Sequence, residues 1–225
     1  MPSGKIHLVA REHPTPTERY HHGDLRKALI LGAAELIEEQ GLLAFSMIGA
    51  ARRVGVSSAA PYRHFRDKND LLNAVTDLAF LALSNEVEAA ADQHEAGTER
   101  CIAALGSTYM RFLVEHQPFY ELMWGKQGAE LSAEEHIESR TSGFRLLIST
   151  LALWCDRRGI THRRPEELAL GFWSMAHGMS VLQSHKAFTY FGHDADIEAM
   201  LRTNTKAFLL GIAATQSHLD DPVEG

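Results

Sequence analysis

Apolar residues recur at intervals of three and four along most of this 225-residue chain. The first such stripe consists of Leu25, Leu29, Ala33 and Leu36. This spacing places side chains on one face of an α-helix. No segment shows sustained alternation of apolar and polar residues with β-branched enrichment, which is the pattern of a half-buried strand. We therefore expect an all-α chain of about nine helices.

Capping residues mark where these helices should begin and end. Asp24 precedes the first stripe and Gly41 follows it, which suits an N-cap and a C-terminal stop. Ser46 is placed to cap a short helix over 47–54. The remaining helices are expected at 58–65, from Asp67 through Leu81, and at 99–115, 118–124, 132–158 (with a capping box at 132–135), 165–184 (with Pro165 in its first turn) and 194–216.

Two of the expected helices are short and consecutive, over 46–65, which predicts a helix-turn-helix. Ala50 and Ala51 are small enough for close helix packing, and Gly55 suits a turn that requires a positive φ. The second helix opens with small residues, which would let it approach a DNA major groove closely. Groups able to bond phosphates or base edges follow them. This set comprises Ser57, Ser58, Ala59, Ala60, Tyr62, Arg63, His64 and Lys68. From the spacing alone, an ordinary helical hairpin remains the alternative.

The order of residues from His22 to about Leu81 resembles the DNA-binding domain of TetR-type (tetracycline-repressor-like) transcriptional regulators. The shared features are Gln40-Gly41, Phe45-Ser46, Ala50-Ala51, Val54-Gly55-Val56-Ser57, Tyr62-Arg63-His64-Phe65, Lys68 and Leu71-Leu72. The resemblance implies that Ser46, Tyr62, His64 and Lys68 hold DNA phosphates, and that Ser58, Ala59, Ala60 and Arg63 face bases. Ser46 replaces the usual threonine, and Pro61 replaces a commoner leucine, which affects the expected pitch of the recognition helix.

The charge distribution fits this division of the chain. The chain carries 22 Lys+Arg and 29 Asp+Glu, a formal net charge of −7. Residues 1–68 carry ten basic and seven acidic residues, so the first part is basic and the remainder has a formal charge of −10. We expect a flexible basic arm over 1–21, a helix-turn-helix DNA-binding domain over 22–82, and a ligand-binding and dimerisation domain over 83–225.

The C-terminal part is expected to form a homodimer, by the resemblance and by its apolar pattern. The helix at 165–184 is apolar on most of its circumference, through Leu168, Phe172, Met175, Met179 and Leu182. Such a helix must be covered on several sides. A second subunit is one cover, with Ile197, Leu201, Phe208 and Ile212 of the last helix completing a four-helix interface. The alternative is the central helix of a monomer. Trp173, His177 and Gly178 resemble the tryptophan–histidine–glycine motif of one branch of the family.

Aromatic and methionine residues in the C-terminal part suggest a site for a small apolar or aromatic effector. The candidate residues are Phe119, Met123, Trp124, Trp154, Phe172 and His177. For each of them the alternative is an ordinary place in the core. His177 either donates a hydrogen bond to the effector or forms its hydrogen bonds within the core.

Other function classes find less support in the sequence. A metal- or haem-sensing regulator is the main alternative, because the chain has thirteen histidines, but no tight ligand spacing occurs. No catalytic motif is present, so we expect no enzyme and no cofactor. Two cysteines, no apolar run that could cross a membrane and no secretory signal indicate a cytoplasmic protein without a membrane partner. Its expected partners are double-stranded operator DNA, a small-molecule effector and a second copy.

Overall fold

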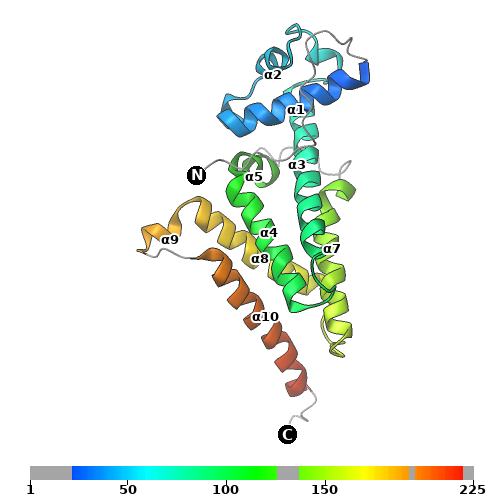
Figure 1. The fold of residues 1–225 in the computed structure, drawn as a ribbon, viewed down its shortest axis with the longest axis vertical. Coiled ribbons are helices and arrows are strands. Elements are labelled where there is room, and N and C mark those ends of the chain that lie inside the picture. The colour runs from blue at the N-terminus through cyan, green and yellow to red at the C-terminus, as the bar shows by residue number, and fades with distance from the viewer. Residues whose placement is uncertain (1–21, 126–136, 193–195, 220–225) are drawn as a thin grey trace. The chain divides into compact units, whose positions relative to one another are not determined.

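The computed structural model describes residues 22–125, 137–192 and 196–219 (Figure 1). Within those ranges the chain forms nine α-helices and two 3₁₀ helices, and no strand. The predicted all-α class is confirmed. The expected arm over 1–21 and the capping box at 132–135 lie outside the described residues.

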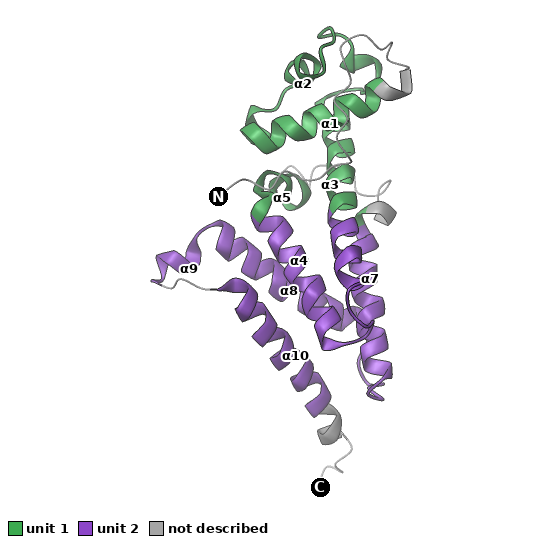
Figure 2. Cartoon of the chain, in the orientation of Figure 1, with its two compact units in different colours: residues 1–82, 115–140 green, residues 83–114, 141–225 purple. Residues whose placement is uncertain are grey.

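The chain divides into two compact units (Figure 2). The first contains residues 1–82 and 115–140, and the second contains 83–114 and 141–225. Helix α3 (Lys68–Ala91) contributes residues to both units.

The first unit is built around α1 (His22–Gln40), which packs against α2 (Met47–Val54) and α5 (Gln117–Trp124). At the α5 end, His116 Nδ1 lies 3.0 Å from Glu38 Oε1 of α1. Helix α1 begins two residues before Asp24, so the prediction that Asp24 caps it is wrong. The core consists of apolar residues with almost no exposure: Leu29, Ala33, Ile37, Ala50, Phe65, Leu71, Leu72 and Val75.

The predicted ends of α2 are confirmed. The N–H of Gly49 donates to Ser46 Oγ at 3.0 Å, so Ser46 caps the helix. Gly55 ends it with φ 76°, a left-handed conformation that glycine adopts without a steric penalty. A 3₁₀ helix, η1 (Leu42–Ala44), joins α1 to α2.

The helix expected over 58–65 is wrong as an α-helix. Residues 58–60 form a turn, and η2 (Pro61–Arg63) is a 3₁₀ helix. The N–H groups of Arg63 and His64 donate to carbonyls three residues earlier, and that of Phe65 donates to the Pro61 carbonyl four residues earlier, so the segment is a 3₁₀ helix that ends in a single α-type bond.

The second unit contains the end of α3, α4 (Glu99–Glu115), α7 (Ile137–Asp156) from residue 141, α8 (Pro165–Ser184), α9 (Ala187–Tyr190) and α10 (Ile197–Leu219). The predicted bounds of α4 and α8 are confirmed. The periodicity did not predict α9, since four residues are too few to show a helical repeat. The core includes Ile102, Met110, Leu113, Leu151, Trp154, Phe172, Leu201 and Leu209. None of the helices described is long and apolar enough to cross a membrane.

Candidate DNA-binding and effector sites

The predicted DNA-contacting residues lie between the start of α2 and the start of α3, all in the first unit. Tyr62 is 57% exposed. The other exposed members are Ser46, Ser57, Ser58, Ala59 and Arg63, and the half-buried members are Ala60, His64 and Lys68. This segment therefore combines small residues with hydrogen-bonding groups on the surface.

The backbone around Pro61 determines how Tyr62 and Arg63 are presented. The N–H of Ala60 donates to the Ser57 carbonyl at 2.9 Å, and the N–H of Arg63 donates to the Ala60 carbonyl at 3.1 Å. The N–H of His64 donates to the Pro61 carbonyl at 2.9 Å. Pro61 itself is buried. A buried ring at the start of η2 fixes this tight turn and leaves the next two side chains exposed.

Cationic side chains lie against aromatic rings on either side of this turn. The Lys68 ammonium lies 5.6 Å from the centroid of the Phe45 ring, and the Arg26 guanidinium lies 5.0 Å from that of Phe65. Both separations are within the range of a cation–π interaction. The ring of Phe45 thus positions the side chain of Lys68, one of the predicted phosphate contacts.

Exposed residues on α2 were missed by the sequence reasoning. Ile48 is 55% exposed and Arg52 is exposed, four positions further along the helix. The opposite face, with Met47, Ala50 and Ala51, is buried. The i, i+4 spacing of Ile48 and Arg52 was the sequence signal that could have identified this outer face.

Three of the predicted effector residues lie on α5, in the first unit. Phe119 and Met123 are buried, whereas Trp124 is 39% exposed. The Trp124 ring meets the Phe80 ring edge-on, with 5.5 Å between the centroids. Phe119 and Met123 are therefore core residues. Trp124 instead forms a partly exposed aromatic pair with Phe80.

His177 lies in an aromatic cluster of the second unit, which we define as Tyr109, Phe144, Trp173 and His177. The Tyr109 hydroxyl and His177 Nδ1 are 2.8 Å apart, within hydrogen-bonding distance. The Trp173 ring centroid lies 5.2 Å from that of His177 and 6.2 Å from that of Phe144. Burial lowers the pKa of His177, so its imidazole is neutral at pH 7.

Trp154 and Phe172 are in the same unit but are core residues. Trp154 stacks under the Arg158 guanidinium, 4.6 Å from its ring centroid, and its indole nitrogen has no hydrogen-bond partner among the described residues. It follows Phe144 by ten positions on α7, which is about 15 Å at the helical rise. The Phe172 ring packs against Gly106 and 6.1 Å from the Phe208 ring. Trp154 therefore lies apart from the aromatic cluster around His177.

Within the described ranges, no group of three or more His, Cys, Asp or Glu residues could hold a metal ion. The metal-sensing alternative receives no support from these residues.

Comparisons with known proteins identify both parts of the chain. The family model "Bacterial regulatory proteins, tetR family" matches residues 29–75. A second model, "Tetracyclin repressor-like, C-terminal domain", matches residues 102–208. The comparison with curated proteins gave no match.

Several solved structures share the fold. A protein of unknown function from Rhodococcus sp. RHA1 is 28% identical, with 88% of this chain and 100% of that chain covered and a TM-score of 0.76. A putative transcriptional regulator from Pseudomonas aeruginosa PAO1 is 15% identical over 87% of this chain and 93% of its own, with a TM-score of 0.68. The TetR family regulator PfmR from Thermus thermophilus is 22% identical over 80% and 96%, with a TM-score of 0.55. The chain carries both the N-terminal and the C-terminal domain of the TetR family, and it is a TetR-family transcriptional regulator.

Proposed function

We propose that this regulator is a homodimeric repressor that binds a palindromic operator and releases it when a small apolar or aromatic molecule binds the C-terminal domain. The observation that carries the proposal is the surface around η2. Small exposed residues, Ser57 to Ala59, allow close approach to a groove, and the buried Pro61 holds Arg63 and Tyr62 outward beside them. Arg63 is the residue we assign to base reading, since a guanidinium bonds a guanine edge with two donors.

The effector site is proposed at the aromatic cluster of Tyr109, Phe144, Trp173 and His177, rather than at all six residues expected from the sequence. Flat aromatic rings suit an apolar or aromatic molecule. A neutral imidazole bonded to a tyrosine hydroxyl offers a polar group without the cost of a buried charge. Phe119, Met123 and Trp124 are proposed to pack within the first unit, and Trp154 and Phe172 within the core of the second unit.

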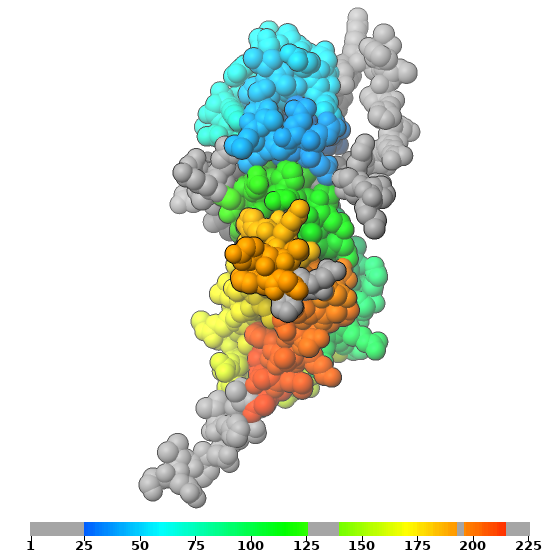
Figure 3. Space-filling model, turned by 90° about the vertical axis from the view of Figure 1, so that its left-hand side faces the viewer, coloured from blue at the N-terminus to red at the C-terminus, as the bar shows by residue number. Residues whose placement is uncertain are grey.

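A second copy is the partner proposed for the outer faces of α8 and α10. Leu170 and Leu182 of α8 are exposed, and Leu210 of α10 is 55% exposed. Helices α9 and α10 lie on one exposed face of the second unit (Figure 3). Leu201 and Ile212, which were expected in the interface, are instead buried within their own chain. The partner would therefore meet Leu210 and its exposed neighbours.

We propose that α3 couples effector binding to the release of DNA. This helix begins at Lys68, next to the predicted DNA contacts, and continues without a break to Ala91 in the second unit. An effector that prefers a state with α3 displaced lowers operator affinity by the ratio of its affinities for the two states.

The test combines DNA selection, mass measurement and a ligand screen. The purified protein should select duplexes with two inverted half-sites about 34–36 Å apart, and light scattering should give the mass of a dimer. A thermal-shift screen of aromatic and apolar compounds should yield one that raises Tm and releases the selected duplex. His177→Phe should abolish that Tm shift while leaving DNA binding intact. Selection of unpaired single half-sites, or a monomer bound to DNA, would contradict the proposal.

A further inference from the structure

Two neighbouring arginines on α2 have opposite environments. Arg53 Nη1 lies 3.2 Å from Glu35 Oε2 and 3.0 Å from Glu39 Oε1, and these α1 carboxylates raise the pKa of the Arg53 guanidinium. Arg52 is exposed, and no ion pair or hydrogen bond joins its guanidinium to a residue in the described part of the chain. One arginine ties α2 to α1, and the other is left facing solvent.

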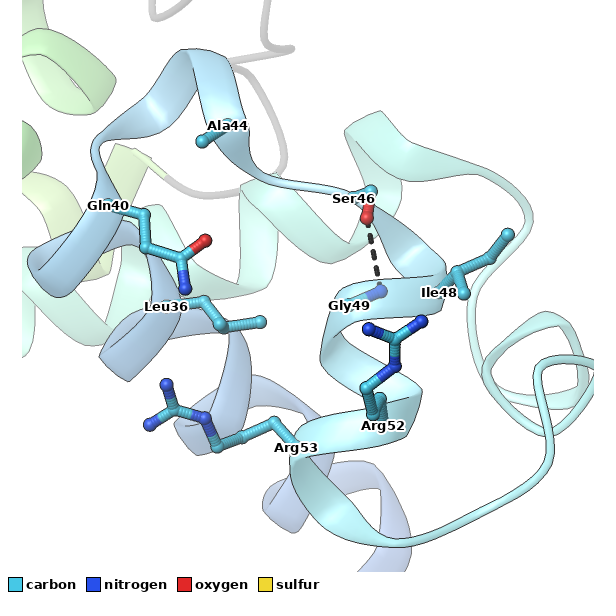
Figure 4. Close-up of a pocket in the computed structure, with 8 residues that line it drawn as sticks. All are labelled: Leu36, Gln40, Ala44, Ser46, Ile48, Gly49, Arg52 and Arg53. Atoms are coloured by element: carbon cyan, nitrogen blue, oxygen red, sulfur yellow. Dashed lines mark hydrogen bonds between the residues drawn. The ribbon is translucent and has the colours of Figure 1, made fainter.

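Arg52 lines a surface hollow of about 440 Å³ between the end of α1 and the outer face of α2. Gln40 of α1 and Ser46, Ile48 and Gly49 of the α2 start share its lining (Figure 4). In that view the Arg52 side chain extends along α2 toward Gly49. Arg53 also lines the hollow, but its side chain reaches toward α1, where Glu35 and Glu39 bind its guanidinium. Of the two guanidinium groups on the wall of the hollow, that of Arg53 is bound by carboxylates and that of Arg52 is available to a ligand, beside the Gln40 amide and the Ser46 hydroxyl.

The charge of the lining selects the ligand class. No aspartate or glutamate is among the lining residues, so an anion would meet a cation and hydrogen-bond donors. A guanidinium presents five donors in a planar fork that matches phosphate oxygens. Ser46, a predicted phosphate contact, is on the same wall, and Arg52 lies six residues further along, about 9 Å at the helical rise. A DNA backbone that reaches Ser46 thus passes close to this hollow.

We propose that the hollow seats a phosphate of the DNA backbone, with Arg52 as its charged donor, in addition to the contacts made around η2. The inference rests on the proposed DNA-binding function. A backbone phosphate carries no sequence information, so Arg52 contributes affinity and salt dependence and leaves the reading of bases to Arg63.

The experiment measures the salt dependence of binding to a duplex that the wild-type protein selects from a random library. Fluorescence anisotropy gives the affinity between about 50 and 200 mM salt. In Arg52→Gln the slope of log K against log[salt] should fall by about 0.9 for each phosphate contact, or about 1.8 for a dimer. The ratio of the wild-type affinity to the variant affinity should therefore fall by about twelvefold between the lowest and the highest salt concentration. Preference for the selected duplex over a scrambled one should be unchanged.

Arg53→Gln is the matched control, since it removes the same charge one residue away. Its slope should equal that of the wild type, while its thermal stability falls. Arg52→Lys should keep most of the wild-type slope, which makes the test independent of whether Arg53→Gln folds. Equal loss of slope in both glutamine variants, or no loss in Arg52→Gln, would overturn the inference while the wild type still binds. If the wild type selects no duplex, the proposed DNA-binding function is contradicted, and the inference that rests on it is contradicted too.

A free anion is the other source of the same chemistry. Inorganic phosphate, added at constant ionic strength, should shift Tm equally in wild type and in Arg52→Gln. A Tm increase confined to the wild type, with no change of salt slope in the variant, would assign the hollow to a free phosphate and overturn the DNA-backbone assignment.

Discussion

Gly106 is the position where one added methyl group should have the most informative effect on stability. It lies within α4 and is buried against the Phe172 ring of α8. An alanine Cβ there would lie 2.7 Å from Phe172 Cζ, 2.9 Å from Cε1, and 3.3 Å from Leu201 Cδ2. Ordinary carbon–carbon contacts are about 3.5–4.0 Å. The ring or one of the helices must therefore move by most of an ångström.

The magnitude follows from two opposing terms. Alanine in place of glycine in a helix interior adds about 0.5–1 kcal/mol of stability. Overpacking a close-packed core costs about 1–3 kcal/mol, and the Phe172 ring that would have to move also packs near the Phe208 ring, with 6.1 Å between the centroids. Within one chain, Gly211→Ala supplies the first term alone, because nothing lies within 4 Å of a Cβ at that exposed position. Gly211 adjoins Leu210 in the proposed dimer interface, so the comparison requires that both variants keep the same association state. Gly106→Ala should thus be about 1–3 kcal/mol less stable than Gly211→Ala.

Urea unfolding at one chain concentration measures this difference, with light scattering to verify that both variants keep the wild-type association state. Phe172→Leu should destabilise alone, but it should relieve the clash, so the double variant should be more stable than the sum of the single effects allows. Strict additivity in this cycle would show that contact with the Phe172 ring is not the cause and would refute the reasoning.

Four further predictions concern single residues. Gly55→Ala should lose about 1–2 kcal/mol in urea unfolding, since φ is 76° there. Ser46→Ala should lose about 0.5–2 kcal/mol as the N-cap is removed, and Ser46→Thr should not. Arg63→Ala should lose about 1–3 kcal/mol of preference for the selected duplex over scrambled DNA, whereas Lys68→Ala should weaken binding to both alike; anisotropy titrations distinguish them. Burial lowers the pKa of His177, so the unfolded chain takes up that proton first as pH falls; urea unfolding should show the wild type losing stability below about pH 6.5, and a His177→Asn variant losing less.

The helices were predictable where their signals are local. A cap and the glycine that follows a helix act over three or four residues, and so the start and end of α2 at Ser46 and Gly55 matched the structure. Helix α1 shows the limit of such signals. Asp24 is a suitable cap, yet the helix begins at His22, because a good capping residue does not prevent a helix from starting earlier.

The segment after Gly55 was mispredicted because Pro61 allows an α-helix to begin near it but does not require one. Pro61 was compatible with an early helical position, since the first N–H groups of a helix have no partner anyway. In the structure the Pro61 ring is buried, and the backbone on either side of it closes over three residues, from Ala60 to Ser57 and from Arg63 to Ala60, as a turn and a 3₁₀ helix. The exposed residues of that segment follow from composition, but their backbone depends on the burial of the proline.

The effector residues were the least predictable part, because they depend on the packing of several helices. Apolar periodicity shows that a residue such as Trp154 is inside, but not which inner face it shares. Phe144 and Trp154 are both on α7, and only the first contacts Trp173. The pairing of Tyr109 with His177 joins residues 68 positions apart, and no pattern along the chain encodes such a contact.

The sequence predicts the position of Arg52 but not the ion pairs of Arg53. Consecutive helical residues differ by about 100° around the axis, so two adjacent arginines point in different directions. Ala50 and Ala51 define the buried face, and Arg52 is four residues from the exposed Ile48. Periodicity alone therefore places Arg52 on the outer face of α2. The carboxylates that bind Arg53 are a different matter, because Glu35 and Glu39 meet it only through the packing of α1 on α2. The control in the salt experiment thus depends on tertiary structure, while the residue it controls for was already indicated by the spacing.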